Sequence, residues 1–329
     1  MEPGVCRVFI LKLIPLLDDQ AQLNMLPFSV TILGSSSALP TLTRFPTSQV
    51  VNLNEKYYLV DCGEGAQIQL RKFGFKFSKI NHIFISHLHG DHIFGLPGLI
   101  SSMTLAGKKG ELHIYAPSEL KMMMDSLLKF MNESEADLSI IYHPLNFRKR
   151  ALIFEDARLT IESFPLKHRI PCCGFLFKEK PHELNLRVDQ IKFYAVPVKD
   201  RVAIKGGANF VLPDGRVIPN ADLTFPAEPV RAYAFCSDTL PRKQILPIID
   251  GIDLLYHEAT FCDDLKALAL KTFHSTAKQA AEIASQARVK RLIIGHFSSR
   301  YKNEEPLVNE AAALFPNTFA ANEGCRFDL

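Results

Sequence analysis

The stretch Ile85–Gly95, with the sequence ISHLHGDHIFG, constrains the fold more than any other part of the chain. It follows the β-rich run HIFIS and holds four potential ligands within six positions: His87, His89, Asp91 and His92. In an extended loop alternate side chains point the same way, so the first two histidines can bind one ion while the last two ligands face a second position. Imidazole nitrogen and carboxylate oxygen suit zinc, and also manganese or iron. The spacing therefore predicts a metal site at the end of a β-strand.

One loop offers too few ligands for a pair of metal ions, so further ligands are expected at distant strand ends. The candidates are His168 in FPLKHRIPCCGF, Asp238 in FCSDT and His296 in IIGHFSSR. The two oxygens of Asp238 can bridge ions at the separation of about 3.5–4 Å that two-metal hydrolases use. Singly, each residue has an ordinary structural alternative, but the joint spacing favours metal ligands. The remaining histidines considered are expected to be structural: His82, His113, His143, His182 and His257.

Short β-rich runs alternate with amphipathic stretches from Phe28 onward. SVTIL, SQVVNL and YYLVD are typical of consecutive strands, and EGAQIQLRKF is typical of a helix. Later strand-like runs end in Asp, Glu or His, as in RAYAFCSD, DLLYHE and RLIIGH. Enzymes of the α/β class place chemistry at such strand ends. The pattern predicts layered sheets covered by helices.

Charge and cysteine usage exclude several classes of protein. Lys plus Arg number 38 against 35 for Asp plus Glu, and the formal net charge of +3 is too balanced to indicate a nucleic-acid binder by itself. The seven cysteines form no CxxC pair and no disulfide framework, which favours a reducing, cytoplasmic location. No apolar run approaches the roughly 20 residues of a membrane span. Lys12 and Pro15 interrupt RVFILKLIPLL, so a signal peptide is not expected there.

The positive excess lies in one segment, Arg187–Lys205, which contains five basic and two acidic residues. Phe193 and Tyr194 lie in the same segment. Phosphate contact and base stacking both need that combination, although a solvated helix with a loop explains the charge equally well. The candidate nucleic-acid contacts are Lys192, Lys199, Arg201 and Lys205.

The order of the motifs resembles the metallo-β-lactamase superfamily: DCGEG at Asp61–Gly65, HLHGDH, His168, SDT and GHFSSRY. More narrowly, the chain resembles the ribonuclease Z family, endonucleases that mature transfer-RNA 3′ ends, in ILGSSSALPT, TSQVVNL, HGDHIFGLPGL, YHEATF and FHSTAKQAA. The resemblance runs from about Phe28 to the C-terminus. It implies an α/β fold, a four-layer αββα metallo-β-lactamase-like sandwich with an inserted flexible arm. It also implies a homodimer with two zinc ions per subunit, with Mn²⁺ or another divalent metal as the alternative.

The resemblance implies a role for each matching residue. The ligands of one zinc ion would be His87, His89, His168 and Asp238. The ligands of the other would be Asp91, His92, Asp238 and His296. Asp61 would orient histidine rings without touching the metal, a task that physical argument also gives to a carboxylate just after a strand. An ordinary strand-end cap is the alternative for Asp61.

The expected reaction is hydrolysis of a phosphodiester. Zinc lowers the pKa of bound water to around 7 and so supplies hydroxide for in-line attack, with Asp91 able to accept a proton. HSTAKQ fits a capping box, which places His274 just outside a helix N-terminus. The family implies that Glu258 and His274 act as a general-acid pair and that Arg300 holds a phosphate oxygen.

The sequence therefore predicts a zinc-dependent endoribonuclease that removes 3′ trailers from precursor transfer RNA, leaving a 3′-hydroxyl on the transfer RNA and a 5′-phosphate on the trailer. A metallo-β-lactamase-fold hydrolase of a small phosphodiester or other small molecule is the alternative, because one ligand set serves many reactions. The set of Glu258, His274, Arg300 and the basic segment favours the nuclease, since a small uncharged substrate needs none of them. A non-catalytic RNA-binding relative would have little use for a complete ligand set.

The domain prediction is a single nuclease domain over residues 25–329, with an arm-like insertion at about 178–208. Met25 opens MLPFSVTILG, which looks like a natural beginning, so residues 1–24 are expected to be an N-terminal appendage or an upstream-start segment. A DGRVIP hairpin is expected after the arm. The family arm commonly has a Gly-Pro tip, whereas this chain has Val196-Pro197-Val198, a departure that bears on its grip on RNA.

Overall fold

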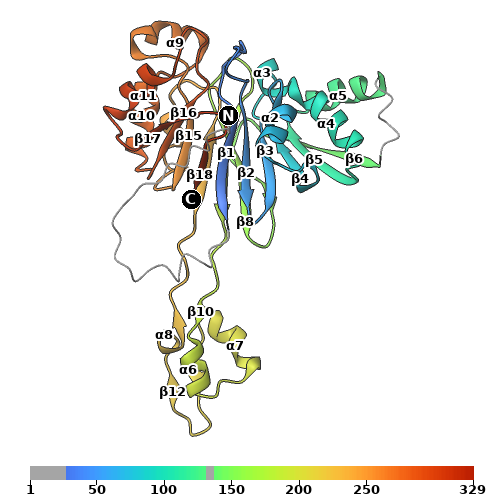
Figure 1. Cartoon of the computed structure of the whole chain (residues 1–329). Helices are drawn as coiled ribbons and strands as arrows, with labels where there is room; N and C mark the ends of the chain where they lie inside the picture. The colour runs from blue at the N-terminus through green and yellow to red at the C-terminus, as the bar shows by residue number, and fades with distance from the viewer. Residues whose placement is uncertain (1–26, 131–136) are drawn as a thin grey trace, which may run out of the picture. The chain divides into compact units, whose positions relative to one another are not determined.

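The computed structural model describes residues 27–130 and 137–329, which Figure 1 draws as a coloured ribbon. The predicted appendage, residues 1–24, lies outside the described residues. The chain forms two compact units. We call the larger one the body (residues 27–130, 137–154, 161–177 and 232–329) and the smaller one the insertion unit (residues 155–160 and 178–231). The predicted arm segment falls within the insertion unit; its boundaries stay a prediction.

In the described part of the chain, the first sheet has seven strands. Their spatial order is β18 (Arg326–Asp328), β1 (Phe28–Gly34), β2 (Ser48–Leu53), β3 (Lys56–Val60), β4 (Ile80–Phe84), β5 (Gly110–Ala116) and β6 (Leu138–Pro144). Pairing is antiparallel from β18 to β3 and parallel from β3 to β6. The carboxyl ends of the parallel strands therefore meet at one edge, where the loop with the four clustered ligands begins.

The second sheet also has seven strands within residues 27–130 and 137–329. Their order is β17 (Thr318–Ala320), β16 (Leu292–Gly295), β15 (Leu254–Glu258), β14 (Ala232–Cys236), β9 (Cys173–Glu179), β8 (Leu159–Pro165) and β7 (Ala151–Glu155). Strands β14 to β17 are parallel. Because neighbouring parallel strands end at the same edge, the polar residues that follow β14, β15 and β16 are brought together.

Helices cover the outer face of each sheet. Those of the described body are α2 (Ala66–Lys72), α3 (Gly90–Ile93), α4 (Gly95–Leu105), α5 (Glu119–Phe130), α9 (Lys266–Thr272), α10 (Ala277–Gln286) and α11 (Glu305–Ala312), with 3-10 turns η1 (Phe77–Lys79), η3 (Lys243–Ile245) and η4 (Asp263–Leu265). Leu99 of α4 belongs to one buried cluster with Ile83 and Ile114 of the first sheet. Ala281 of α10 packs in another with Ile294 of the second sheet. None of the helices in the described residues combines the length and apolar character needed to cross a membrane.

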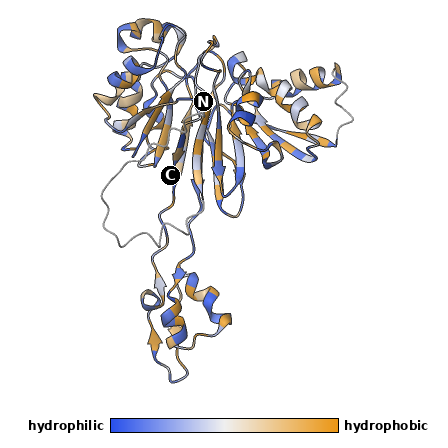
Figure 2. Ribbon diagram, viewed as in Figure 1, coloured by the Kyte–Doolittle hydropathy of each residue, from blue (hydrophilic) through white to orange (hydrophobic). Residues whose placement is uncertain are grey.

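Aromatic rings fill the space between the two sheets. The ring centroid of Phe84 on β4 lies 5.6 Å from that of Phe175 and 5.7 Å from that of Phe177, both on β9, with the rings edge to face. Buried aromatic pairs favour this geometry. Figure 2 shows hydrophobic residues along the strands of both sheets. The layers run helix, sheet, sheet, helix, which confirms the predicted αββα sandwich.

The insertion unit has its own small core. It contains β10 (Asn185–Leu186), α6 (Val188–Phe193), α7 (Val198–Lys205), β11 (Phe210–Val211), β12 (Val217–Ile218), α8 (Asn220–Leu223) and β13 (Thr224–Phe225). Strand β10 pairs with β13, and β11 pairs with β12 across the predicted DGRVIP hairpin, which is thereby confirmed. The buried residues of its apolar cluster are Ile191, Val196, Ile204, Phe210, Ile218 and Leu223.

Candidate metal centre and acid pair

All seven predicted metal ligands come together in the body. They form two groups in which one ligand atom of each member lies within 4.8 Å of the others: His87, His89, His168 and Asp238, and Asp91, His92, Asp238 and His296. Four separate chain segments contribute, following β4, β8, β14 and β16. Asp91 and His296, which are 205 positions apart in sequence, thus share one site.

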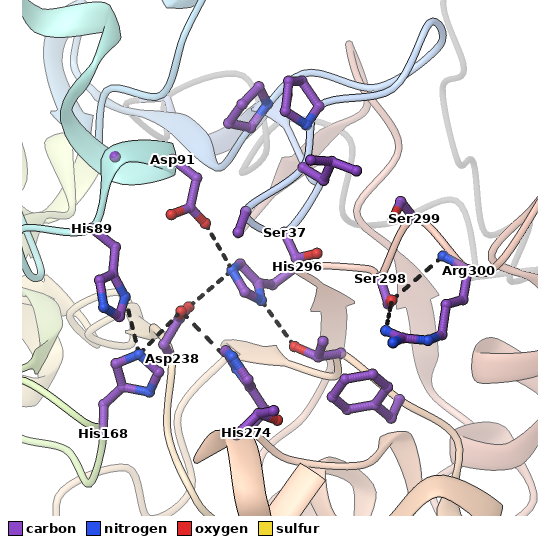
Figure 3. A pocket seen from close by; sticks show the side chains of 18 of the residues that line it. Ser37, His89, Asp91, His168, Asp238, His274, His296, Ser298, Ser299 and Arg300 are labelled. Atoms are coloured by element: carbon purple, nitrogen blue, oxygen red, sulfur yellow. Dashed lines mark hydrogen bonds and ion pairs between the residues drawn. The ribbon is translucent and has the colours of Figure 1, made fainter. Parts of the chain in front are cut away.

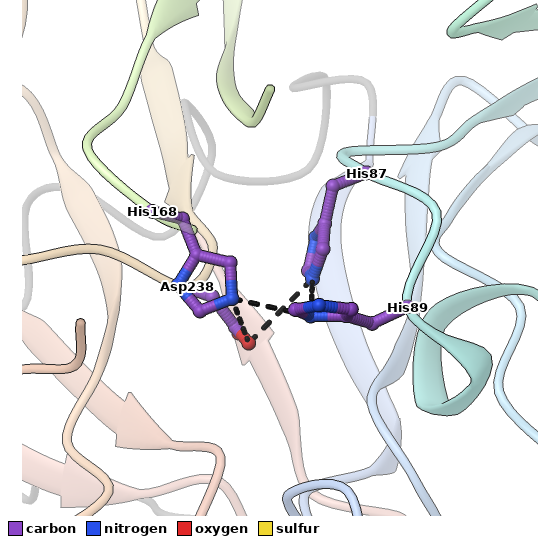
Figure 4. Close-up of side chains that lie close together, drawn as sticks. All are labelled: His87, His89, His168 and Asp238. Carbon is purple, nitrogen blue, oxygen red and sulfur yellow. Dashed lines mark hydrogen bonds and ion pairs between the residues drawn. The ribbon is translucent and has the colours of Figure 1, made fainter. Parts of the chain in front are cut away.

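Three histidine nitrogens of the first group face one point, as Figure 4 shows. Nδ1 of His89 lies 3.0 Å from Nε2 of His87 and 3.1 Å from Nε2 of His168. Oδ2 of Asp238 lies 3.6 Å from the first of these Nε2 atoms and 3.7 Å from the second. This convergence of nitrogen and oxygen atoms is the donor arrangement of a zinc-type site.

The second group shares Asp238 through the other carboxylate oxygen. Oδ1 of Asp238 lies 3.4 Å from Nε2 of His92 and 3.2 Å from Nε2 of His296. Oδ2 of Asp91 lies 3.3 Å from each of the same two nitrogens. Asp238 therefore directs one oxygen to each group, which is the arrangement that a bridging ligand requires.

Hydrogen bonds hold the outward nitrogens of the rings. Nδ1 of His168 lies 2.9 Å from the carbonyl oxygen of Phe273, so Nδ1 must carry the proton that it donates. The inward Nε2 of the neutral ring is then left with its lone pair free for a metal. Nδ1 of His296 lies 2.9 Å from Oγ1 of Thr260. Such partners orient a metal-binding histidine and fix its tautomer.

Two buried polar atoms inside the cluster lack a hydrogen-bond partner in the part of the chain that the structure describes: Nε2 of His92 and Oδ1 of Asp238. Leaving such atoms unsatisfied costs roughly 1–3 kcal/mol each, unless a ligand completes them. Both atoms belong to the second ligand group. The donor set and these two atoms fit a divalent metal ion.

The charges of the cluster favour a cation. Burial raises the pKa of Asp238, but the positive charges attributed to His296 and His92 outweigh it and hold this pKa well below the ordinary value. Burial lowers the pKa of His92, but Asp91 and Asp238 outweigh it and raise this pKa well above the ordinary value. The carboxylates thus attract positive charge to the position between them, where a divalent cation can take the place of the imidazolium proton.

Asp61, expected to orient histidine rings, contacts His92. Its Oδ2 lies 2.7 Å from Nδ1 of His92, and its two oxygens accept hydrogen bonds from the backbone N–H and the hydroxyl of Ser86 at 2.7 and 2.9 Å. Asp61 is fully buried and has a φ of 53°, and His296 has a φ of 60°. Left-handed backbone at non-glycine residues is strained and often marks functional sites.

Glu258 and His274 form a hydrogen-bonded pair beside the cluster. Nδ1 of His274 lies 3.0 Å from Oε1 of Glu258, which also accepts backbone N–H bonds from Thr239 and Ser275 at 3.1 and 2.9 Å. Burial lowers the pKa of His274, but the charge and hydrogen bond of Glu258 outweigh burial and raise it to about 9. The imidazole is therefore protonated at neutral pH and able to donate a proton.

The predicted capping box at the start of α10 is confirmed. Oγ1 of Thr276 accepts a hydrogen bond from the backbone N–H of Gln279 at 3.2 Å, and the Gln279 side chain accepts one from the Thr276 N–H at 2.9 Å. This cap fixes the residues just before the helix, and His274 stands two positions ahead of it. The local sequence thus positions the acid pair.

A pocket of about 550 Å³ opens over these groups, and Figure 3 shows its lining. His168 and His89 lie at one side of the view and Arg300 at the other, with His296 between them. Arg300 donates to Oγ of Ser298 at 3.3 Å and is solvent-exposed. Its guanidinium has no carboxylate partner among the described residues, so it is free to hold a phosphate oxygen.

The four predicted RNA contacts belong to the insertion unit, and the structure gives them different surroundings. Lys192 and Lys199 are exposed and form no ion pair within the described residues. Arg201 donates to the carbonyl oxygen of Val196 at 3.2 Å, and Lys205 lies 3.6 Å from Glu183. Two of the four cations are thus already engaged within the unit. Contact with RNA stays a prediction for all four.

Sequence reasoning missed the residues that hold the rings. Ser86 immediately precedes His87 and its hydroxyl lies 3.0 Å from Nδ1 of that ring, and Thr260 belongs to the HEAT motif. Both could have been predicted from the sequence, because each lies in or directly beside a motif that carries a site residue. The role of the Phe273 carbonyl could not have been predicted from the sequence, because every residue has a backbone carbonyl. A stacked pair of histidines was also missed: Nδ1 of His113 lies 3.0 Å from Nε2 of His143 on the adjacent strand.

Known proteins share both sequence and fold with this chain. Residues 28–194 match the family model described as Anti-Pycsar protein Apyc1. A Bacteroides fragilis protein named Ribonuclease Z is 51% identical over 302 residues, covering 92% of this chain and 99% of that protein. The crystal structure of the short form of human tRNase Z superposes with a TM-score of 0.66 at 27% identity, covering 91% and 98% of the two chains. A Bacillus subtilis metallo-β-lactamase fold protein, 16% identical with a TM-score of 0.65 and covering 93% and 100%, shares the fold.

Proposed function

Because the chain belongs to the ribonuclease Z family, and is therefore a hydrolytic transfer-RNA 3′-processing endoribonuclease, we propose that its histidine–aspartate cluster holds two zinc ions and that the Glu258–His274 pair supplies the acid. The observation that carries the family assignment is the 51% identity over nearly all of both chains. The family model matched at residues 28–194 covers about half of this chain, whereas the ribonuclease Z relative covers 92% of it, so that relative decides the family.

The proposed ligands of one zinc ion are His87, His89, His168 and Asp238. Those of the other are Asp91, His92, Asp238 and His296, with Mn²⁺ or another divalent metal as the alternative in both positions. When bound, such ions lower the pKa of water and stabilise negative charge on a phosphoryl oxygen. Convergence of the inward nitrogens and the two unpartnered buried atoms supports this assignment. Asp61 orients His92 through the 2.7 Å hydrogen bond to its outer nitrogen.

Side chains of the protein accept and donate the protons of the reaction. Asp91 accepts a proton from the attacking water, since its side chain lines the pocket beside His92 and His296. His274 donates a proton to the departing 3′-oxygen of the transfer RNA body, and Glu258 stabilises the protonated imidazole before transfer. Arg300 holds a phosphate oxygen from the opposite side of the pocket. The products are a 3′-hydroxyl on the transfer RNA and a 5′-phosphate on the trailer.

The finer organisation is proposed on the family resemblance. The nuclease domain spans residues 25–329 and acts as a homodimer. Residues of about 178–208 act as an arm that holds precursor transfer RNA through Lys192, Lys199, Arg201 and Lys205. A cytoplasmic location is supported by the cysteines: in the described residues Cys62, Cys172, Cys173, Cys236 and Cys262 form no disulfide.

The test is cleavage of a precursor transfer RNA with a 3′ trailer by the zinc-loaded protein, with the cut mapped to the nucleotide. We expect a cut near the discriminator base that the Asp91→Ala variant does not make. Asp250→Ala is the matched control, because Asp250 is an exposed aspartate paired with Arg288 and lines neither the pocket nor the cluster. An intact precursor, together with hydrolysis of bis(p-nitrophenyl) phosphate by the same preparation, would move the substrate to a small phosphodiester.

A further inference from the structure

A second hollow of the body adjoins the pocket and has a different character. It measures about 900 Å³ and lies between residues 144–148, at the end of β6 and in the loop after it, and the loop after β8, residues 166–172, with Arg242 beside them. His168 and Arg169 line both this hollow and the pocket. A chain that passes over the cluster can therefore continue into the hollow. We call it the basic groove.

Positive charge dominates the basic groove. Its lining includes four permanent cations and no carboxylate: Arg148, Lys167, Arg169 and Arg242. Arg169 donates to the carbonyl oxygen of Thr272 and Arg242 to that of Leu166, both at 3.3 Å. Neutral carbonyls thus orient two of the guanidinium groups, and neither group forms an ion pair within the part of the chain that the structure describes.

Several cations elsewhere in the body are compensated by carboxylates. Ion pairs bind Lys79 to Glu55 and Lys290 to Asp253, both at 2.7 Å, and Arg150 to Glu162. The side chains of Arg148 and Lys167, by contrast, are exposed and form no ion pair within residues 27–130 and 137–329. Four uncompensated cations around one hollow create a strong positive potential, which a polyanion would neutralise.

The groove also offers surface for bases. Phe147, Ile170 and Pro171 line it between the cations. Cations that follow a backbone, interleaved with an aromatic ring on which a base stacks, are the features of single-strand binding sites. A base-paired stem keeps its bases inside the duplex, so it cannot use this surface. Of the nucleotides beside the cut, the 3′ trailer is the part that continues as a single strand.

We propose that the basic groove binds the single-stranded 3′ trailer of the precursor, with Arg148, Lys167, Arg169 and Arg242 contacting its phosphates and Phe147 stacking on a base. The proposal rests on the nuclease function given above. It assigns the two sides of the active pocket: the trailer leaves past His168, and Arg300 holds the scissile phosphate from the other side.

The test compares precursors with a trailer of one nucleotide and of about ten nucleotides. The variant is the double substitution Arg148→Glu with Lys167→Glu, because neither side chain donates a hydrogen bond within the described residues, so the fold should tolerate both changes. The matched control is Lys76→Glu with Lys129→Glu, two exposed lysines that line neither hollow. Thermal melting and hydrolysis of bis(p-nitrophenyl) phosphate report whether the fold and the cluster are intact.

We expect KM for the long-trailer precursor to rise about tenfold in the groove variant. The slope of log(kcat/KM) against log salt concentration should also become shallower, by the amount that the loss of about two phosphate contacts predicts. The one-nucleotide precursor and the control variant should change by less than about twofold. An unchanged KM for the long trailer overturns the proposal. An equal loss with both trailers also overturns it, since that result places the acceptor end in the groove. Failure of the unaltered protein to cut any precursor would instead reject the nuclease function.

Discussion

The metal cluster and the insertion unit use polar residues in opposite ways. In the cluster, His87, His92 and Asp238 are almost completely buried, and hydrogen bonds fix the rings. In the insertion unit, the cations Lys192 and Lys199 are exposed around a small apolar core. Bond cleavage needs metal ligands held in one geometry, whereas contact with the phosphates of a flexible RNA needs charged side chains that are exposed and can reach those phosphates. The comparison predicts large effects on kcat from the cluster and small effects on KM from the insertion unit.

The largest effect should come from Asp238, because its two oxygens face both ligand groups. We expect Asp238→Ala to lower kcat on precursor transfer RNA by at least about 10³-fold, since several kcal/mol of charge stabilisation are lost. Metal content, measured on the purified variant by mass spectrometry, should fall as well. A variant that keeps two metal ions and ordinary kcat would break the comparison.

Removal of the acid should give the next largest effect and should depend on the leaving group. We expect His274→Ala to slow cleavage of precursor transfer RNA by about 10²-fold or more, because the departing 3′-oxygen needs a proton. Hydrolysis of bis(p-nitrophenyl) phosphate should change far less, because p-nitrophenolate leaves without one. Equal losses on both substrates would show that His274 acts on the metal cluster rather than as an acid.

Asp61 should have an intermediate effect. Asp61→Asn keeps the shape but weakens the hydrogen bond to His92, so metal affinity or kcat should fall by about 10- to 100-fold. Added zinc should restore part of the activity if the change acts through metal affinity. Asp250→Asn is the matched control at an exposed position, and an equal loss there would reject the assigned role.

Charge in the insertion unit should affect substrate affinity alone. We expect Lys192→Gln with Lys199→Gln to raise KM for precursor transfer RNA by roughly threefold at unchanged kcat. Lys205→Gln should change KM less, because Lys205 already faces Glu183. A fall in kcat with unchanged KM would contradict the division of labour between the two regions.

The smallest effect concerns the stability of the insertion unit at low pH. Burial raises the pKa of Glu179, but hydrogen bonds and the charge of Arg231 outweigh burial and lower this pKa below its ordinary value. The stabilisation is therefore present above the ordinary glutamate pKa near about 4 and is lost as the pH falls through the lower pKa of the folded protein. Hydrogen exchange of residues 178–231 in the full chain should quicken between neutral pH and pH about 3, after correction for intrinsic exchange rates, and Glu179→Gln should remove that dependence.

Much of the site was predictable because its residues occur in local motifs. HLHGDH gives four ligands in one loop, and HSTAKQ combines His274 with a capping box that the structure confirms. The strand-like runs that lead to Asp238, Glu258 and His296 also predicted that polar residues would lie at strand ends. Because these strands are parallel neighbours in the structure, the three residues come together at one edge of the sheet. The pairing of His113 with His143 was not predictable, because it depends on which strands are adjacent and in what register.

The sequence by itself determined the ligand types, the strand–loop pattern around them and the family. Only the tertiary structure decided which nitrogen of each ring faces inward, that Asp238 divides its oxygens between the two groups, and that Arg148, Lys167 and Arg242 gather beside His168. The physical reason is the distance along the chain over which each kind of interaction acts. Periodicity and capping act within a few residues, whereas ring orientation and shared charge arise where loops from different strands converge on one edge of the sandwich.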